Sequence, residues 1–198
     1  MNTRQNMKIK RYFSWLILFL MSMAFIACQE RMGHEVRASK ADSVLFDVGV
    51  RMEYDSMIVL ANAYEQQGLI SQLDANRWRG VAYYHQGHYR MSEIYYRKSI
   101  ECEVKTDEDQ VSYNKCARRL SELLLVKGDY EGSLQVAIPA VKKMDETGIG
   151  SDIDYAILLN NIGCCQINLG QDDEAKESFL TARGHYANRW QTTRSEER

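Results

Sequence analysis

The sequence predicts an all-α fold, a solenoid of antiparallel helix pairs, and three observations support this. The 198 residues contain a single proline, Pro139, and 12 glycines, so few residues interrupt a long helix. Glycines that follow helix-like stretches recur at Gly87, Gly128 and Gly170, with spacings of 41 and 42 residues. Such a period is typical of solenoids, in which each unit buries its apolar face by stacking on the next.

Each repeat follows one pattern of helix, glycine, polar turn and helix. The glycine ends the first helix, because it adopts the left-handed conformation without steric cost. Polar segments at 105–110 and 146–152 are the expected joints between repeats. Upstream, 41–52 and 53–69 have apolar residues at helical spacing and form an earlier, degenerate unit. Pro139 lies inside a second helix and is expected to kink or shorten it.

The residues of these units resemble the tetratricopeptide repeat family. The first unit carries the pattern in Gly80, Tyr83, Gly87, Tyr89, Ser92, Tyr96 and Ser99; the middle unit in Leu120, Ser121, Leu124, Gly128, Tyr130, Ser133, Ala137 and Ala140; the third in Leu159, Gly163, Gly170, Ala175, Phe179 and Ala182. The family's period is 34 residues. The longer period here therefore predicts longer helices or longer joints, with three to four helix pairs over 41–187.

Tyrosines are dense between Gly80 and Ile100, where five of them occur. Their repeat positions indicate that Tyr83, Tyr89 and Tyr96 are packing residues. Tyr84 and Tyr95 fall at positions that are freer to be exposed.

Residues 1–28 resemble an export signal with a bacterial lipobox at its end. Four basic residues precede an apolar run that ends in "FIAC", which places lipidation at Cys28. The alternative is an uncleaved membrane anchor, although the run is short for a spanning helix. Residues 29–40 are polar and predict a flexible spacer. Either anchor places the remainder in the cell envelope, facing the periplasm or the cell surface.

The charge of the chain argues against nucleic acid as a partner. Of the 25 Lys and Arg, four lie in the export signal, which leaves 21 against 27 Asp and Glu, a charge of −6. Phosphate binding needs a basic patch. The expected partner is a protein or peptide in the envelope, with the membrane contacted through the N-terminal lipid or helix.

The sequence predicts no enzyme, no cofactor and no metal. It contains no P-loop, no GxGxxG, no HExxH and no GxSxG. Cys164 and Cys165 are adjacent, which is not a metal-binding spacing. The cysteines after Cys28 are expected to be small buried residues, with a Cys102–Cys116 disulfide left open as an alternative.

The resemblance places the first helix of each unit along a partner-binding groove. It implies groove positions at Arg77, Val81, Tyr84, His85, Arg118, Glu122, Leu125, Asn160, Cys164, Ile167 and Asn168. Arg77, Arg118 and Asn160 occupy one equivalent position, a ladder suited to a carboxylate or peptide backbone. The alternative is that they are ordinary solvated residues of the solenoid face.

The order of lipoprotein-like signal, polar spacer and repeats is similar to the N-terminal periplasmic sensor region of membrane histidine kinases from the Bacteroidetes group. That resemblance implies a ligand- or protein-sensing module of a signal-transduction system, truncated or without its kinase. The alternative is a free-standing envelope lipoprotein that scaffolds a protein complex. The last helix, expected at 173–186, exposes Phe179 and Leu180, which predicts self-association or fraying there. Residues 188–198 are expected to be a disordered tail.

Overall fold

The computed structural model of the protein describes residues 40–196, with side chains described for 40–185. The predicted export signal, its Cys28 and residues 29–39 of the predicted spacer lie outside the described residues. The chain divides into two compact units, Met1–Val44 and Leu45–Arg198. The first is described only at residues 40–44, where a helix that covers 40–50 begins.

Helices make up nearly all of the second unit, and the part of it that is described contains no strand. The helix over 40–50 is followed by α2 (Tyr54–Gln66), α3 (Gln72–His85), α4 (Tyr89–Ile100), α5 (Asp107–Val126), α6 (Tyr130–Thr147), α7 (Asp152–Asn168) and α8 (Asp172–Glu196). In residues 40–196, none of the helices is both long enough and apolar enough to cross a membrane. The fold confirms the predicted all-α solenoid.

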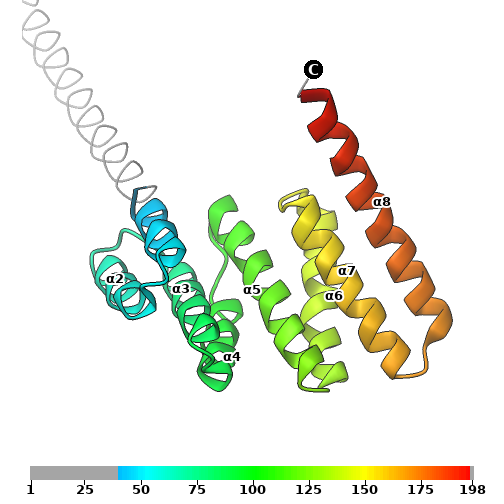
Figure 1. Ribbon diagram of the computed structural model, residues 1–198, viewed down its shortest axis with the longest axis horizontal. Helices are drawn as coiled ribbons and strands as arrows, with labels where there is room; N and C mark the ends of the chain where they lie inside the picture. The colour runs from blue at the N-terminus through cyan, green and yellow to red at the C-terminus, as the bar shows by residue number, and fades with distance from the viewer. Residues whose placement is uncertain (1–39, 197–198) are drawn as a thin grey trace, which may run out of the picture. The chain divides into compact units, whose positions relative to one another are not determined.

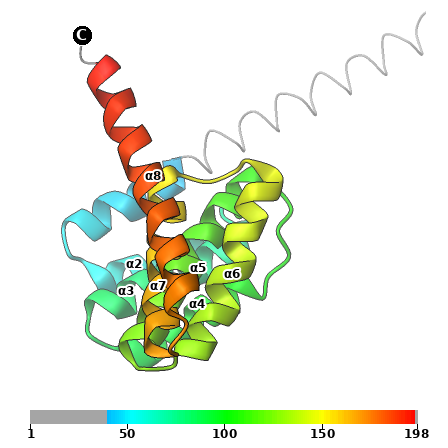
Figure 2. The same ribbon diagram turned by 90° about the vertical axis from the view of Figure 1, so that its right-hand side faces the viewer.

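The helices pair in sequence order, α3 with α4, α5 with α6 and α7 with α8. The first helices of the pairs, α3, α5 and α7, lie side by side in one layer, with α4 and α6 behind them (Figure 1). Figure 2 shows the same two layers from the side of α8. We refer to α3, α5 and α7 as the first-helix layer.

The turn between the two helices of a pair is the same in all three repeats. Gly87, Gly128 and Gly170 have φ angles of +78°, +79° and +74°, which side chains other than glycine rarely adopt. The residue after each glycine donates its N–H to a carbonyl five residues earlier, as in the bond from His88 to Tyr83 of 2.9 Å. These bonds satisfy carbonyls that the end of the helix would otherwise leave unpaired.

Small residues bring the two helices of a pair into close contact. A Cβ on Gly80 would lie 2.5 Å from Cε1 of the buried Tyr96, and one on Gly163 would lie 2.8 Å from the Phe179 ring. In the first pair, Ser92 donates its hydroxyl to the Gly80 carbonyl at 2.9 Å. In the second pair, the bond from Ser133 to the Ser121 carbonyl at 2.8 Å is equivalent. The family pattern of small and aromatic residues therefore has a direct packing role.

The longer period is explained by longer helices. α3 and α4 have 14 and 12 residues, whereas α5 and α6 have 20 and 18. α5 starts at a Thr106 cap, whose hydroxyl accepts from the Asp109 N–H at 3.1 Å. α6 passes through Pro139 and ends at Gly148, so the proline does not shorten the helix. Pro139 is exposed and lies nine residues after the first residue of α6. Proline lacks the backbone N–H that would bond within the helix, and the chain accommodates this loss at the exposed position.

The C-terminal helix is longer than the sequence suggested. α8 continues to Glu196, so residues 188–196, expected as a disordered tail, have a helical backbone. No glycine or proline follows Gly184. Gln, Glu and Arg, which favour helices, are frequent there, so the sequence contains no strong stop signal.

Two other sequence-based expectations can be compared with the structure. Tyr96 is buried as expected, and Tyr83 is half-buried and stacks on Tyr95 with ring centroids 5.4 Å apart. The prediction for Tyr89 was wrong: 55 % of this residue is exposed, because it is the first residue of α4 and only its ring edge contacts Tyr84. Cys102, Cys116, Cys164 and Cys165 are free thiols, so no Cys102–Cys116 disulfide is present.

Candidate interaction surface

The predicted groove residues all belong to the first-helix layer. Arg77, Val81, Tyr84 and His85 are on α3; Arg118, Glu122 and Leu125 are on α5; Asn160, Cys164, Ile167 and Asn168 are on α7. The structure therefore brings them into one layer, as the repeat pattern required. Their exposure and partners differ, and these differences show which residues are able to contact a partner.

Arg77 is buried, and its charge is paired within the chain. Its Nε lies 2.7 Å from Asp74 Oδ1, one turn earlier on α3. The same carboxylate oxygen accepts a hydrogen bond from the Ser112 hydroxyl of α5 at 2.8 Å. Arg77 also lies over the Trp78 ring, with its Cζ 4.1 Å from the ring centroid. The Asp74 carboxylate thus joins α3 to α5, and Arg77 compensates its charge.

Arg118 is also paired with a carboxylate of the chain, but its partner lies in the next repeat, whereas the partner of Arg77 lies on the same helix. The Arg118 Nε lies 2.7 Å from Asp154 Oδ1 at the start of α7, and both side chains are largely buried. Ser112 and Asp154 occupy equivalent positions in successive repeats. The two arginines of the predicted ladder are therefore held in ion pairs within the chain, one inside α3 and one between α5 and α7. The third equivalent residue, Asn160, is exposed and its amide lies 3.9 Å from Cys164 Sγ.

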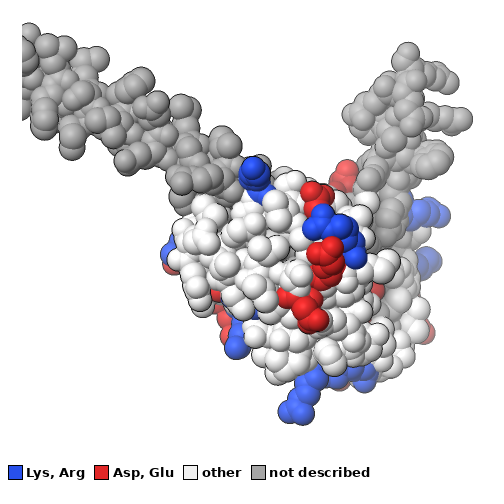
Figure 3. All heavy atoms as spheres, turned by 60° about the vertical axis from the view of Figure 1, so that its left-hand side comes forward, with Lys and Arg blue, Asp and Glu red and all other residues white. Residues whose placement is uncertain are grey.

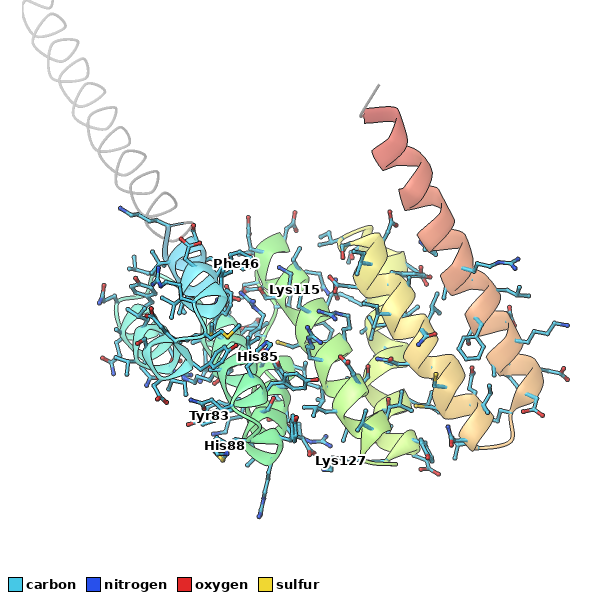
Figure 4. The ribbon with its side chains drawn as sticks, in the orientation of Figure 1. Phe46, Tyr83, His85, His88, Lys115 and Lys127 are labelled. Atoms are coloured by element: carbon cyan, nitrogen blue, oxygen red, sulfur yellow. The ribbon has the colours of Figure 1, made fainter. Side chains whose placement is uncertain are left out.

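Tyr84 and His85 lie at the C-terminal end of α3, where Figure 4 shows His85 above Tyr83 and the turn residue His88. The exposed His85 stacks on Tyr54 of α2, with ring centroids 5.2 Å apart. Partial burial, and then the charge of Arg119, lower the pKa of His85 below its ordinary value. At neutral pH the ring is therefore uncharged and able to contact an apolar or aromatic group.

Tyr84 connects the first repeat with the second. It is half-buried, and Cζ of Arg119 lies 5.6 Å from its ring centroid. Arg119 also pairs with the half-buried Glu122, with Nη1 3.0 Å from Oε2. On α7, the exposed Asn168 donates to the Cys164 carbonyl at 2.8 Å. Glu122 and Asn168 therefore have partners within the chain and retain solvent contact.

Apolar residues lie at the C-terminal ends of the helices of this layer. Tyr84, Leu125 and Ile167 occupy one equivalent position in the three repeats, and Val126 follows Leu125. We call these four residues the apolar row. Ile167 is 53 % exposed and Val126 is 81 % exposed. The sequence analysis missed Val126; the signal was an apolar residue directly before the polar turn at Lys127 and Gly128.

A second feature, a polar cleft, lies over α2, α3 and α4. It has a volume of about 770 Å³ and is lined mainly by polar side chains, including Asn62, Asn76, Arg79 and Lys98. The buried Arg79 donates to Asn62 at 2.7 Å and to Asn76 at 2.9 Å, and it also pairs with Glu65. Sequence reasoning missed this cleft, because single polar residues on a helix do not indicate which neighbours they meet.

Charge and ligating groups on the described surface do not gather into a single site. On the face shown in Figure 3, acidic and basic side chains lie next to one another in a band across a largely uncharged surface, and further charged side chains lie around its edge. Among residues 40–196, no three His, Cys, Asp or Glu side chains lie close enough together to hold a metal ion. The apolar row and the polar cleft are therefore the surfaces to be explained.

Comparison with known families gives one match. The Tetratricopeptide repeat model matches residues 156–182, which cover most of α7 and the beginning of α8. No curated protein matches the chain. Tetratricopeptide repeats mediate contacts between proteins and generally serve as non-enzymatic scaffolds. The matched repeat and the three equivalent helix pairs identify the fold of this chain as a tetratricopeptide-like α-solenoid.

Proposed function

We propose that the protein is a non-enzymatic, membrane-tethered interaction module that binds an extended peptide segment of an envelope protein along its first-helix layer. The module is proposed to act as the ligand- or protein-sensing part of a signal-transduction system. The N-terminal sequence supports the tether, through its basic residues, short apolar run and Cys28. The resemblance to sensor regions of histidine kinases supports the role in signalling.

The observation that carries the proposal is the apolar row. Tyr84, Leu125 and Ile167 recur at one position of three helices that lie side by side. Packed helices are about 8–10 Å apart, and three residues of an extended chain span about 10 Å. In a polyproline II segment an apolar side chain at every third residue points to the same side, and the repeat of about 9.3 Å fits the row. In a fully extended strand such side chains alternate between the two faces, so the polyproline II form of an extended peptide is the one that fits.

The predicted arginine ladder has a smaller part in this proposal than the sequence suggested. Because Arg77 and Arg118 are paired with Asp74 and Asp154, their charges are compensated within the chain, and the second pair joins α5 to α7. His85, Asn160 and Asn168 are exposed beside the row. We propose that they supply polar contacts to the peptide backbone, while the apolar row selects the side chains.

The proposed binding mode is tested with synthetic fluorescent peptides and the full chain in mild detergent. One peptide carries leucine at every third position in a serine and asparagine background, and its control carries leucine at every second position. We expect the first to bind at least about tenfold more tightly. Val126→Lys should abolish this preference, whereas Ile138→Lys, on the exposed side of α6, should leave it unchanged. Equal binding of both peptides would refute the proposed fit.

The tether is tested separately by metabolic labelling with a clickable palmitate in a Gram-negative host. Label on the wild-type chain and none on Cys28→Ala supports a lipoprotein anchored outside the cytoplasm. Absence of label on the wild-type chain would refute lipidation and leave an uncleaved anchor or a simple signal.

A second role, as an envelope lipoprotein that scaffolds a complex, is favoured by the polar cleft. The cleft involves α2, α3 and α4 and does not include the apolar row, so two different partners can be bound together. Lys98→Glu in the cleft should then weaken one partner while Val126→Lys weakens another. If the sensor proposal holds, Val126→Lys alone should affect binding.

A further inference from the structure

A shallow groove lies between the C-terminal end of α7 and the first three turns of α8. Its volume is about 460 Å³, and its lining includes Ile167 of α7 and the residues Asp172, Lys176, Phe179, Leu180 and Arg183 of α8. Leu180 is 47 % exposed. Phe179 is half-buried against Gly163 of α7, and no described segment of the chain covers the outer side of Leu180.

The α8 residues of the groove form one stripe along the helix. Asp172, Lys176 and Arg183 lie four and seven residues apart, with Phe179 and Leu180 between Lys176 and Arg183. At 3.6 residues per turn all five lie on one side of α8. An acidic residue therefore stands at one end of the stripe and a basic residue at the other, about 16 Å apart at 1.5 Å per residue.

This order of charges is self-complementary when two such stripes are antiparallel. When two copies are related by a two-fold axis, every contact between them occurs twice. If one residue of the first copy contacts another residue of the second copy, the second contact exchanges the two copies. If Asp172 of the first copy faces Arg183 of the second copy, then Arg183 of the first copy faces Asp172 of the second copy. In the same register Lys176 faces Phe179, over which its hydrocarbon stem and ammonium group can both pack. Leu180 then lies over the position of Ala175, which is small and buried and leaves room for it.

We propose that this groove binds a second copy of the protein, and that the two α8 helices pack antiparallel about a two-fold axis near residues 177 and 178. The apolar centre excludes water, and the two Asp172–Arg183 pairs fix orientation and register. Another protein's helix would have no reason to carry the same reversed order of charges. The groove and the apolar row share only Ile167, because Tyr84, Leu125 and Val126 do not line this groove, so a change at Val126 tests the peptide site without altering the dimer contact.

The first test measures the mass of the full chain in mild detergent by sedimentation velocity over a range of concentrations. We expect a reversible dimer. Leu180→Glu should weaken it by on the order of tenfold or more, because a charge would be buried at its centre. Thr181→Glu is the matched control on the same helix, since Thr181 is exposed and lies outside the groove. Thermal unfolding shows whether each variant is folded.

The second test exchanges the charges. Asp172→Arg and Arg183→Asp should each weaken the dimer, and the double variant should restore it, since each pair is then reversed. Val126→Lys should leave the dimer unchanged. A monomer at all concentrations, a dimer unaffected by Leu180→Glu, or a double variant no better than the single ones would overturn the proposal.

Discussion

At the residue scale, Gly80 and Gly163 show how one missing methyl group shapes the fold. Each lies on the first helix of a pair and is covered by an aromatic ring of the second, Tyr96 or Phe179. We expect Gly80→Ala and Gly163→Ala to lower the free energy of unfolding by about 1–3 kcal/mol, because the added Cβ forces the ring or the helix to move. Urea denaturation followed by circular dichroism measures the change.

The matched control for this prediction is Gly184→Ala. Gly184 also lies within a helix, and a Cβ there would meet nothing within 4 Å. The substitution should stabilise the protein by about 0.5–1 kcal/mol, since alanine favours helices more than glycine. If all three substitutions stabilise the protein to the same degree, Gly80 and Gly163 are not needed for the close packing of the two rings.

Single residues also show where sequence reasoning reaches its limit. Gly80, Ser92 and Tyr96 could be assigned to packing because the repeat fixes their mutual spacing. Tyr89 could not, because its burial depends on how far α4 extends beyond the turn. Arg77 and Arg118 were placed correctly on the first-helix layer, but a repeat pattern does not reveal that Asp74 and Asp154 take up their charges.

At the scale of elements, the ion pair between Arg118 and Asp154 joins α5 to α7. Asp154→Asn keeps the shape of the side chain but leaves a largely buried guanidinium without its counter-charge. We expect a loss of about 2–3 kcal/mol in the free energy of unfolding, below the full cost of an isolated buried charge because Arg118 retains some solvent contact. Glu146→Gln, in the exposed pair with Lys142, should cost less than about 0.5 kcal/mol. Equal costs would contradict a structural role for Arg118.

A second pair, between α4 and α5, predicts a dependence on pH. Burial alone would raise the pKa of Glu93, but hydrogen bonds from Lys127 and Arg97 outweigh it and hold this pKa below the ordinary 4.5. Lys127 Nζ lies 2.5 Å from Glu93 Oε2. A lowered pKa in the folded state means that the stabilisation is complete above pH 4.5 and is lost as the pH falls through the folded-state pKa.

Glu93→Gln removes this pH-dependent contribution. At pH 7 it should lower the free energy of unfolding by about 1 kcal/mol. The difference from the wild-type chain should shrink below pH 4.5 and vanish once Glu93 is itself protonated. Denaturation curves at a series of pH values measure it, with Glu103→Gln in an exposed ion pair as the control. A difference that stays constant down to pH 2 would show that the charge of Glu93 is not the cause.

The helices themselves were largely predictable, and their lengths were not. Glycines at 41- and 42-residue spacing marked each turn, and the repeat grammar supplied the helix on either side. The added length of α5 and α6 depends on the cap at Thr106, where α5 begins, and on Gly148, which follows the end of α6. Neighbouring residues in the sequence are equally plausible starts and ends of a helix. α8 passed its expected end because no residue after Gly184 stops it.

At the scale of the whole molecule, the stacked arrangement predicts how a local change spreads. Each helix pair contacts its neighbours, through α4 with α5, α6 with α7, and within the first-helix layer. In such arrays stability is close to a sum of the repeats and their interfaces. Gly80→Ala should therefore speed hydrogen exchange most in α3 and α4, less in α5, and least in α7 and α8.

Gly163→Ala should give the reverse gradient of hydrogen exchange, with the largest acceleration in α7 and α8 and the smallest in α3. Hydrogen exchange followed by mass spectrometry compares the two variants peptide by peptide, and Gly184→Ala again provides the control. Opposite gradients mean that each end of the array unfolds locally with its own free energy. A peptide bound on the first-helix layer would then stabilise chiefly the repeats that it contacts. Uniform acceleration by both variants would mean that the helices open as one cooperative unit, in which binding at any repeat protects all of them.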